Sequence, residues 1–145
     1  MNRKDFIIKC SMSCLGIVMP AIFQSCAGTK YLDASMEGNN LLIPLASFEI
    51  IKGGDIRYRR YLVAENVALQ FPICVYRLAQ NKYQALWMKC THQGTELQVF
   101  GDRLQCPAHG SEFTNTGAVQ NGPAADPLRN FPVTISETML KVSLQ

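Results

Sequence analysis

The sequence contains few histidines, a single tryptophan and no large excess of either charge. Among its 145 residues two are histidine, and 14 basic against 11 acidic residues leave a formal net charge of +3. A nearly neutral chain gives no electrostatic reason to bind nucleic acid or another polyanion. Neither a serine elbow nor the pattern of a catalytic triad is present. We therefore expect no nucleic-acid partner and no nucleophilic catalysis.

The sequence also lacks an apolar run of the length that an ordinary membrane span has. After Lys9, the uncharged run Cys10–Phe23 has 14 residues, whereas a membrane-spanning helix needs about 20. A run of this length behind a basic start is typical of the core of a signal peptide. We expect a signal peptide in residues 1–25, a tether in residues 26–40 and one folded domain in residues 41–145.

Two segments near the N-terminus resemble export signals. Arg3-Lys4-Asp5-Phe6-Ile7-Ile8-Lys9 resembles a twin-arginine signal with lysine in the place of the second arginine. Phe23-Gln24-Ser25-Cys26-Ala27 resembles a lipoprotein cleavage box, in which Cys26 would become the lipidated first residue. The resemblances imply a bacterial, extracytoplasmic protein on the periplasmic side, anchored in the membrane. Three outcomes stay open: lipidation at Cys26 after cleavage, an uncleaved N-terminal anchor, and release of the cleaved protein.

The cysteines do not form the pairs of a disulfide framework. Three of the six belong to the predicted leader or its boundary, and only Cys74, Cys90 and Cys106 remain in the body. An odd number without obvious pairs argues against a disulfide scaffold, so these thiols need another role. Cys74 lies in an apolar, strand-like run and is predicted to be a buried residue without chemistry.

Long helices and internal repeats are missing as well. No run of ten or more residues keeps a helical period. Short runs rich in β-branched and aromatic residues alternate instead with turn signals such as Gly53-Gly54. The predicted strands are Leu41–Ile43, Ser47–Ile51, Arg60–Ala64, Ile73–Leu78, Gln84–Met88, Glu96–Phe100, Arg103–Gln105, Phe131–Ile135 and Met139–Val142. They predict an all-β sandwich or small barrel, on which Arg57, Arg59 and Arg60 would form a basic patch or only a solvated face.

Two short loops stand apart from this pattern: Cys90-Thr91-His92-Gln93-Gly94-Thr95 and Cys106-Pro107-Ala108-His109-Gly110-Ser111. Both histidines of the chain lie here, each close to a cysteine. The residues between the loops indicate a hairpin turning at Gly101-Asp102, and a hairpin brings its two ends together. The loops should therefore meet at one tip of the sheet, where two thiolates and two imidazoles would bind iron or zinc. Gly94 and Gly110 would let the backbone approach the metal closely.

The spacing Cys-x-His, then 13 residues, then Cys-x-x-His resembles the Rieske iron–sulfur domain. The resemblance implies an antiparallel β-sandwich of Rieske type with a small cluster-binding subdomain at one tip. It also implies a [2Fe–2S] cluster, in which two cysteines hold one iron and two histidines hold the other. By position, Cys90 and Cys106 would hold the inner iron, and His92 and His109 the outer one.

The residues after the second loop resemble those of Rieske proteins from cytochrome bc complexes. The matching segments are Gly110-Ser111-Glu112-Phe113, Gly117-Ala118-Val119 and Gly122-Pro123-Ala124. The resemblance implies that Gly122-Pro123 covers the cluster and that Ser111 donates a hydrogen bond to a bridging sulfide. Thr95 and Ala108 occupy the places of two cysteines that form a disulfide in those relatives, and Phe113 occupies the place of a tyrosine that donates to a cluster cysteine. Because a lost donor destabilises the reduced state, we expect a potential in the middle or lower part of the window of about −150 to +300 mV.

The resemblance implies an electron-transfer component rather than a catalyst that acts alone. It would be an anchored subunit or partner of a quinol-oxidising or periplasmic oxidoreductase, attached to the membrane by a lipid or an N-terminal anchor. A free-standing sensor that carries a cluster is the alternative, as is a structural module in which the four side chains bind one zinc ion. An oxygenase is not expected, because no histidines remain for a second, mononuclear iron site.

Overall fold

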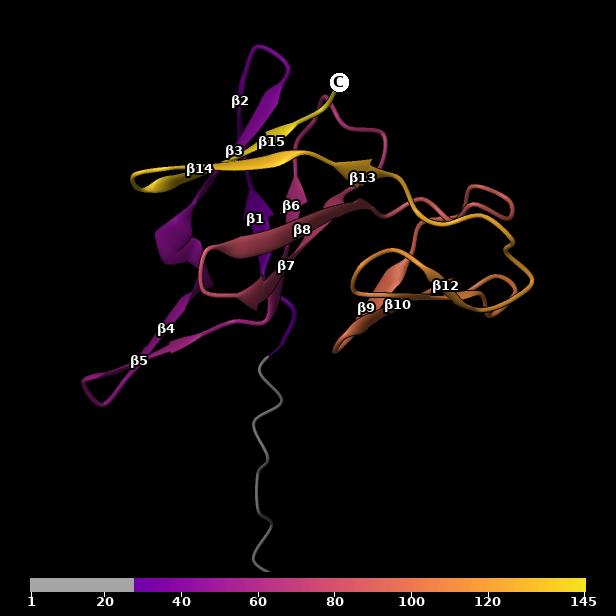
Figure 1. The fold of residues 1–145 in the computed structure, drawn as a ribbon, viewed down its shortest axis with the longest axis horizontal. Helices are drawn as coiled ribbons and strands as arrows, with labels where there is room; N and C mark the ends of the chain where they lie inside the picture. The colour runs from indigo at the N-terminus through magenta and orange to yellow at the C-terminus, as the bar shows by residue number, and fades with distance from the viewer. Residues whose placement is uncertain (1–27) are drawn as a thin grey trace, which may run out of the picture.

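The computed structural model describes residues 28–145, so the predicted signal peptide and Cys26 lie outside the described residues. The regular elements of the described part are strands and one short 3-10 helix (Figure 1). No helix in this part is long and apolar enough to cross a membrane. In chain order the elements are β1 (Tyr31–Asp33), β2 (Ser35–Glu37), β3 (Asn40–Pro44), η1 (Leu45–Phe48), β4 (Glu49–Lys52), β5 (Asp55–Tyr58), β6 (Tyr61–Glu65), β7 (Ile73–Ala79), β8 (Lys82–Trp87), β9 (Gln98–Phe100), β10 (Arg103–Gln105), β11 (Glu112–Thr114), β12 (Val119–Asn121), β13 (Asn130–Phe131), β14 (Val133–Ser136) and β15 (Met139–Ser143).

The strands form three layers, of which the central one is a five-stranded sheet. The central sheet has five strands in the order β1-β6-β7-β8-β13. One of its faces shares a core with the four-stranded sheet β14-β15-β3-β2. The other face shares a second core with the four-stranded sheet β12-β11-β10-β9, which we call the cluster-binding sheet. The hairpin of β4 and β5 projects from the sandwich at the lower left of Figure 1.

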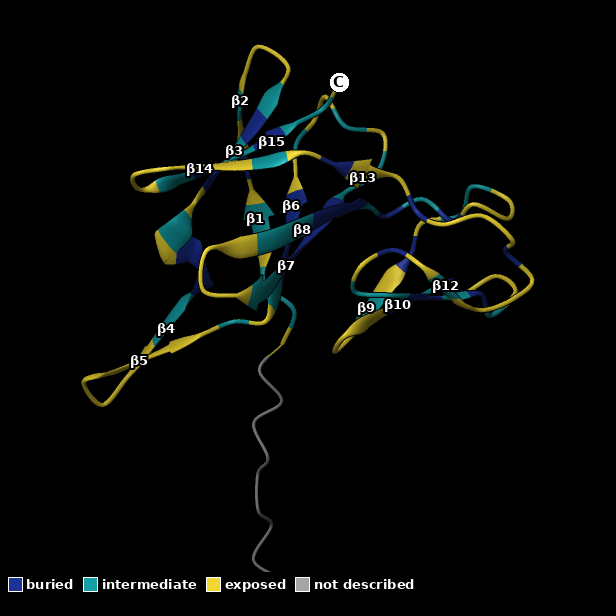
Figure 2. Cartoon of the chain, in the orientation of Figure 1, coloured by how far each residue is buried: buried dark blue, intermediate teal, exposed yellow. Residues whose placement is uncertain are grey.

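The middle of the central sheet is buried on both faces because β6 and β7 are apolar at successive positions. In β7, Ile73 and Val75 pack into the core of the sandwich, whereas Cys74 and Tyr76 pack into the core of the cluster-binding sheet. All four are at most 2% exposed, and Figure 2 colours parts of the central strands dark blue, as buried. Successive side chains of a strand point to opposite faces. An uninterrupted apolar run is therefore the sequence signature of a strand that is covered on both sides.

The predicted all-β fold is confirmed, and so is the hairpin that joins β9 to β10 through the turn at Gly101 and Asp102. Two predicted strands differ in detail. Ser47 begins no strand but lies in η1. The run Phe131–Ile135 is divided between β13 and β14 at Pro132, because a proline has no N–H for the ladder.

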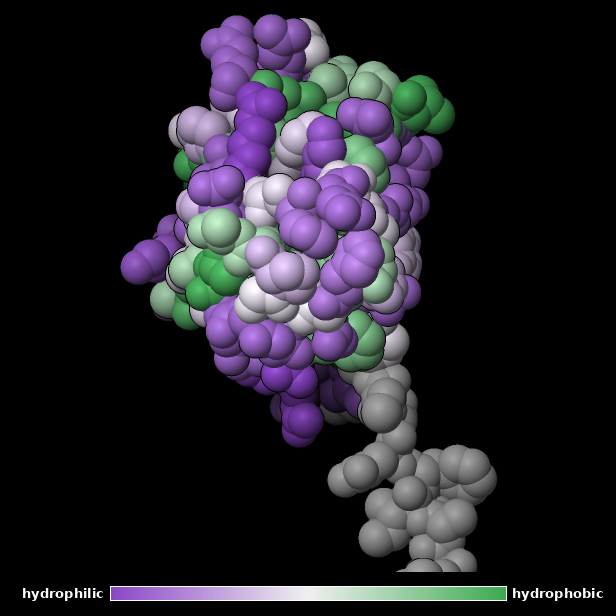
Figure 3. Space-filling model, turned by 90° about the vertical axis from the view of Figure 1, so that its right-hand side faces the viewer, coloured by the Kyte–Doolittle hydropathy of each residue, from purple (hydrophilic) through white to green (hydrophobic). Residues whose placement is uncertain are grey.

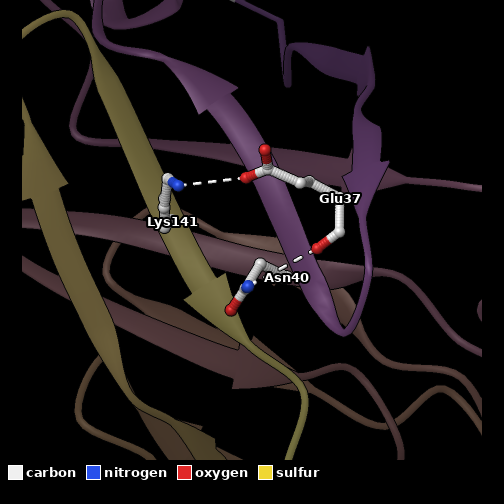
Figure 4. A network of polar contacts seen from close by, with 3 residues as sticks. All are labelled: Glu37, Asn40 and Lys141. Atoms are coloured by element: carbon white, nitrogen blue, oxygen red, sulfur yellow. Dashed lines mark hydrogen bonds and ion pairs between the residues drawn. The ribbon is translucent and has the colours of Figure 1, made fainter.

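The predicted tether is wrong for residues 31–37, which belong to the folded domain. β1 pairs in parallel with β6, and β2 pairs with β3. In Figure 4, Lys141 Nζ lies 3.0 Å from Glu37 Oε2, and Asn40 Nδ2 donates to the Glu37 carbonyl at 3.4 Å. Both strands lie at the edges of their sheets, and edge strands are often short and polar. Their composition is therefore hard to distinguish from that of a tether, and the domain begins near Lys30.

Candidate metal centre

The first of the two Cys-His loops follows β8 and is closed by two backbone hydrogen bonds. The Cys90 N–H donates to the Thr95 carbonyl at 2.8 Å, and the Gly94 N–H donates to the Cys90 carbonyl at 2.8 Å. Gly94 has a φ of +73°, in the left-handed region that favours glycine. Lys89 pairs with Glu96 across the base of the loop. The loop is therefore held at the end of a short ladder.

The second loop, between β10 and β11, repeats this backbone. The Cys106 N–H donates to the Ser111 carbonyl at 2.8 Å, and the Gly110 N–H donates to the Cys106 carbonyl at 3.0 Å. Gly110 has a φ of +79°. The flanking strands β10 and β11 pair antiparallel. Each loop is thus a closed turn that begins at a cysteine and depends on a left-handed glycine four residues later.

The two cysteine side chains meet inside the core of the cluster-binding sheet. Cys90 and Cys106 are each 2% exposed and lie in the same core cluster. Burial raises the pKa of the Cys106 thiol. Hydrogen bonds from the backbone N–H groups of Ala108 and His109, and from the side chains of Cys90 and Thr95, outweigh this effect and lower the pKa below its usual range. Because the thiolate is the form that binds metal, the surroundings of Cys106 favour a ligand.

The two histidine side chains meet at the surface, above the cysteines. The rings of His92 and His109 lie edge to face, with centroids 5.1 Å apart and an angle of 87° between their planes. Both residues are exposed. Figure 3 looks onto this end of the molecule, where hydrophilic residues are interspersed with a few apolar ones. The four predicted ligands are therefore arranged as an inner pair of sulfurs and an outer pair of imidazoles.

A third segment, residues 122–127, contacts both loops. The Ala124 N–H donates to Ser111 Oγ at 3.0 Å, and Thr91 Oγ1 donates to the Asp126 carbonyl at 2.7 Å. The segment includes the exposed cis peptide Gly122-Pro123 and is the one predicted to cover the cluster. Ser111 is fully buried. Its oxygen accepts one hydrogen bond here, so its own O–H is still available to donate.

The other residues singled out near the site occupy different environments. Phe113 lies in β11, fully buried in the core of the cluster-binding sheet. It contributes packing and no polar atom. Thr95 is half-buried, and its side chain hydrogen-bonds that of Cys106. Ala108 is exposed. The two places where relatives carry a disulfide thus both contribute donors to Cys106 here, one through a side chain and one through a backbone N–H.

The sequence reasoning missed a set of residues that surround the first loop. A cavity of about 600 Å³ is lined by His92, Asp126, Trp87, Lys89 and Arg129, among others. Lys89 Nζ lies 4.9 Å from the ring centre of Trp87, and Arg129 Cζ lies 5.9 Å from it. These contacts bring Trp87 and Lys89, which precede the first loop, together with Arg129, which directly precedes β13. No pattern of local spacing indicates them.

The four predicted ligands have the chemistry that a two-iron cluster requires. Thiolates suit iron–sulfur clusters, and imidazoles suit iron. Within residues 28–145 no three Cys, His, Asp or Glu side chains are grouped to hold a single metal ion. The arrangement is instead a buried sulfur pair beside an exposed imidazole pair. It corresponds to a cluster in which two cysteines hold one iron and two histidines the other.

A layered β-sandwich with two Cys-His loops meeting at its tip defines an iron–sulfur domain of the electron-transfer class. Residues 48–132 match the family model of the Rieske [2Fe-2S] domain. The match covers more than half of the chain, which therefore belongs to this family. Its cofactor is a [2Fe–2S] cluster, and its function is electron transfer through that cluster. This membership favours the cluster over a single zinc ion.

Three known proteins illustrate the similarity. A cytochrome b6-f complex iron-sulfur subunit of Chlorobaculum tepidum is 33% identical over 57 residues, which are 38% of this chain and 32% of that protein. The match thus spans about a third of this relative. The cyanobacterial plasma membrane Rieske protein PetC3 from Synechocystis PCC 6803 has a TM-score of 0.51 and 28% identity, covering 58% of this chain and 86% of that one. A chain in the complex of reduced oxygenase and oxidized ferredoxin in carbazole 1,9a-dioxygenase has a TM-score of 0.52 and 26% identity, covering 75% and 96%.

Proposed function

We propose that Cys90 and Cys106 hold the inner iron of the cluster, and that His92 and His109 hold the outer iron and pass the electron. The observation that carries this proposal is the difference in exposure within the four. The cysteines are 2% exposed, whereas both histidines are exposed and their rings lie 5.1 Å apart. Electrons therefore enter and leave at the imidazole edge.

The cluster, when bound, supplies one-electron chemistry, and the protein sets its potential and its access. A neutral imidazole that binds metal through one ring nitrogen keeps an N–H on the other. On an exposed ring this N–H can donate to a partner or exchange its proton with solvent. The imidazoles of His92 and His109 thus orient a docked partner while the buried sulfurs keep water away from the inner iron.

Around this site, hydrogen bonds to sulfur are expected to tune the potential. The Ser111 O–H is available, and Thr95 hydrogen-bonds Cys106. Phe113 has no hydroxyl to contribute. We infer that the potential lies in the middle or lower part of the range for histidine-ligated clusters, about −150 to +300 mV.

We also propose that the domain works as a membrane-anchored, extracytoplasmic subunit or partner of a quinol-oxidising or periplasmic oxidoreductase. Similarity to a cytochrome b6-f subunit and to a plasma membrane Rieske protein supports a membrane context. In this proposal residues 1–25 are a signal peptide and Cys26 carries the lipid. The chain from about Lys30 onward is the electron-carrying head.

The test of the ligand assignment is electron paramagnetic resonance of the purified full chain after chemical reduction, with iron and sulfide counted on the same sample. A rhombic signal with the low average g value of a histidine-ligated [2Fe–2S] cluster is the expected result. A silent sample that contains zinc and no sulfide would contradict it.

The test of the partner is purification of the chain from gently solubilised membranes. Co-purification with a b-type cytochrome or another redox enzyme that reduces or oxidises the cluster is expected. A cluster that is loaded but is oxidised by no co-purifying protein would favour the free-standing sensor instead.

A further inference from the structure

The β4–β5 hairpin carries an exposed apolar pair far from the cluster loops. Ile51 and Ile56 face each other across the two strands, and they are 71% and 56% exposed. Tyr58 follows two residues after Ile56, on the same face, and is 49% exposed. In Figure 1 the hairpin projects at the lower left, whereas the cluster-binding sheet lies at the right. Nothing in the described part of the chain covers this pair.

Beside the hairpin lies a cavity of about 380 Å³ with arginines in its lining. The lining residues are Gly28, Ile50, Tyr58, Arg59, Arg60, Tyr61 and Gly101. Arg59 Nε is buried and has no hydrogen-bond partner among residues 28–145. The same holds for Arg77 Nε nearby, and the Arg77 guanidinium lies 4.3 Å from the ring centre of Tyr58. Because two guanidinium groups line it, this cavity is suited to an oxygen-rich anion.

The charges around the cavity favour an anion as well. On the β4–β5 hairpin and in this and the neighbouring cavity, the basic residues are Lys52, Arg57, Arg59, Arg60 and Arg77, and the acidic ones are Glu49, Asp55 and Asp102. The ion pairs found within residues 28–145 involve Arg103 and Lys141 and none of these five basic residues. Asp102 lies with Arg60 and Arg77 in a neighbouring cavity, at more than ion-pair distance. A positive excess of two charges thus remains on this surface.

We propose that this surface, made of Ile51, Ile56, Arg59 and Arg60, docks the domain onto an anionic phospholipid bilayer. Apolar side chains flanked by basic ones are the combination that binds the interface of such a bilayer. The isoleucines enter the boundary between headgroups and acyl chains. The guanidinium groups of Arg59 and Arg60, which line the cavity, bind lipid phosphates.

The position of Gly28 favours a bilayer over another anionic surface. Gly28 lines the same cavity and lies two residues after Cys26, the attachment point in the proposed function on which this inference rests. Two residues span at most about 7 Å. A lipid on Cys26 would therefore hold the cavity at the headgroups. Docking there would fix the orientation of the head and leave the histidine tip turned toward its protein partner.

The experiment uses the full chain with vesicles of phosphatidylcholine alone or mixed with phosphatidylglycerol. Amide hydrogen exchange is measured over the β4–β5 hairpin. We expect exchange there to be slower by roughly tenfold with phosphatidylglycerol, an effect that corresponds to one or two basic groups at an anionic surface, and to return to the phosphatidylcholine value at high salt. Flotation with phosphatidylcholine vesicles reports the anchor, and the sulfide content reports the cluster. Loss of flotation or of sulfide would therefore indicate that the proposed function is wrong, whereas unchanged exchange in the hairpin would indicate that docking is wrong.

The variant Arg59→Gln/Arg60→Gln should lose the protection, and Ile51→Ser/Ile56→Ser should lose most of it. The control Lys82→Gln/Lys141→Gln removes the same charge from residues that do not line the cavity and should keep the protection. Equal exchange in both kinds of vesicle would overturn the proposal, as would unchanged protection in the arginine variant. Equal protection by inorganic phosphate without vesicles would also overturn it, because the cavity would then be a small-anion site only.

Discussion

The two Cys-His loops share a backbone but differ in what surrounds them. In each, the cysteine N–H is bonded to the carbonyl five residues later, and a left-handed glycine closes the turn. The first loop is tied to the covering segment through the Thr91 side chain, and the second through that of Ser111. Thr91 is exposed and Ser111 fully buried. The shared backbone therefore places the proposed metal ligands in the same way in both loops, whereas the side chains that surround the two loops differ.

The largest effect is expected from removing a sulfur of the inner pair. Cys106→Ala should abolish cluster binding, because two sulfurs are needed to hold the inner iron. The purified variant should contain no sulfide and give no paramagnetic resonance signal after reduction. Cys90→Ala should behave in the same way, which would show that the loops contribute equally. Cys74→Ala is the control, because Cys74 is buried in β7 and burial raises the pKa of its thiol, so the cluster should stay.

The next effect separates the two loops. Ser111→Ala removes a buried hydroxyl, whereas Thr91→Ala removes an exposed one. If the Ser111 O–H donates to the cluster, its loss should lower the potential by about 65–130 mV, the equivalent of one hydrogen bond to a charged group. Thr91→Ala should leave the potential nearly unchanged. Redox titration of both variants measures this, and equal shifts would mean that the loops are not functionally different.

A smaller effect tests the shared backbone. Gly94→Ala and Gly110→Ala each force a side chain into a left-handed conformation, which costs about 1–2 kcal/mol. At Gly110 an added Cβ would meet no atom within 4 Å, and at Gly94 it would lie 3.2 Å from the flexible end of Lys89. The two variants should therefore lose similar free energy of unfolding in denaturant titrations. A much larger loss at Gly94 would show that the loops do not share their constraints.

The smallest effect is expected from restoring a donor near the second loop. Phe113→Tyr adds the hydroxyl that related proteins of cytochrome bc complexes carry at this place. One added hydrogen bond should raise the potential, by tens of millivolts, with the sign opposite to that of Ser111→Ala. Phe113→Leu controls for packing, because it changes the volume without adding a donor. A fall in potential for Phe113→Tyr would contradict the tuning proposed for this site.

The loops and the hairpin between them could be predicted because their constraints are local. Cysteine and histidine spacing, glycines and one turn signal at Gly101-Asp102 lie within a short segment. The edge strand β1 could not be predicted, since it pairs with the distant strand β6, and β2 was missed because three polar-rich residues beside a turn resemble a tether. The strands β11 and β12 each pair with the strand just before them, but three residues are too few to show an alternating pattern, so they were missed as well. The donors that reach Cys106 from Ala108 and Thr95 depend on how the two loops meet, which spacing alone does not determine.

The double burial of the central sheet has a consequence for folding fidelity. In a strand with one solvated face, a slip by one residue moves the apolar side chains from the core into solvent. In β7 such a slip would move the Tyr76 ring and the Cys74 thiol into the core built for Ile73 and Val75, and the reverse exchange would occur on the other face. A chain in the wrong register would therefore lose packing in both cores. The alternation that divides the two cores thus also specifies the register in which β7 pairs with its neighbours.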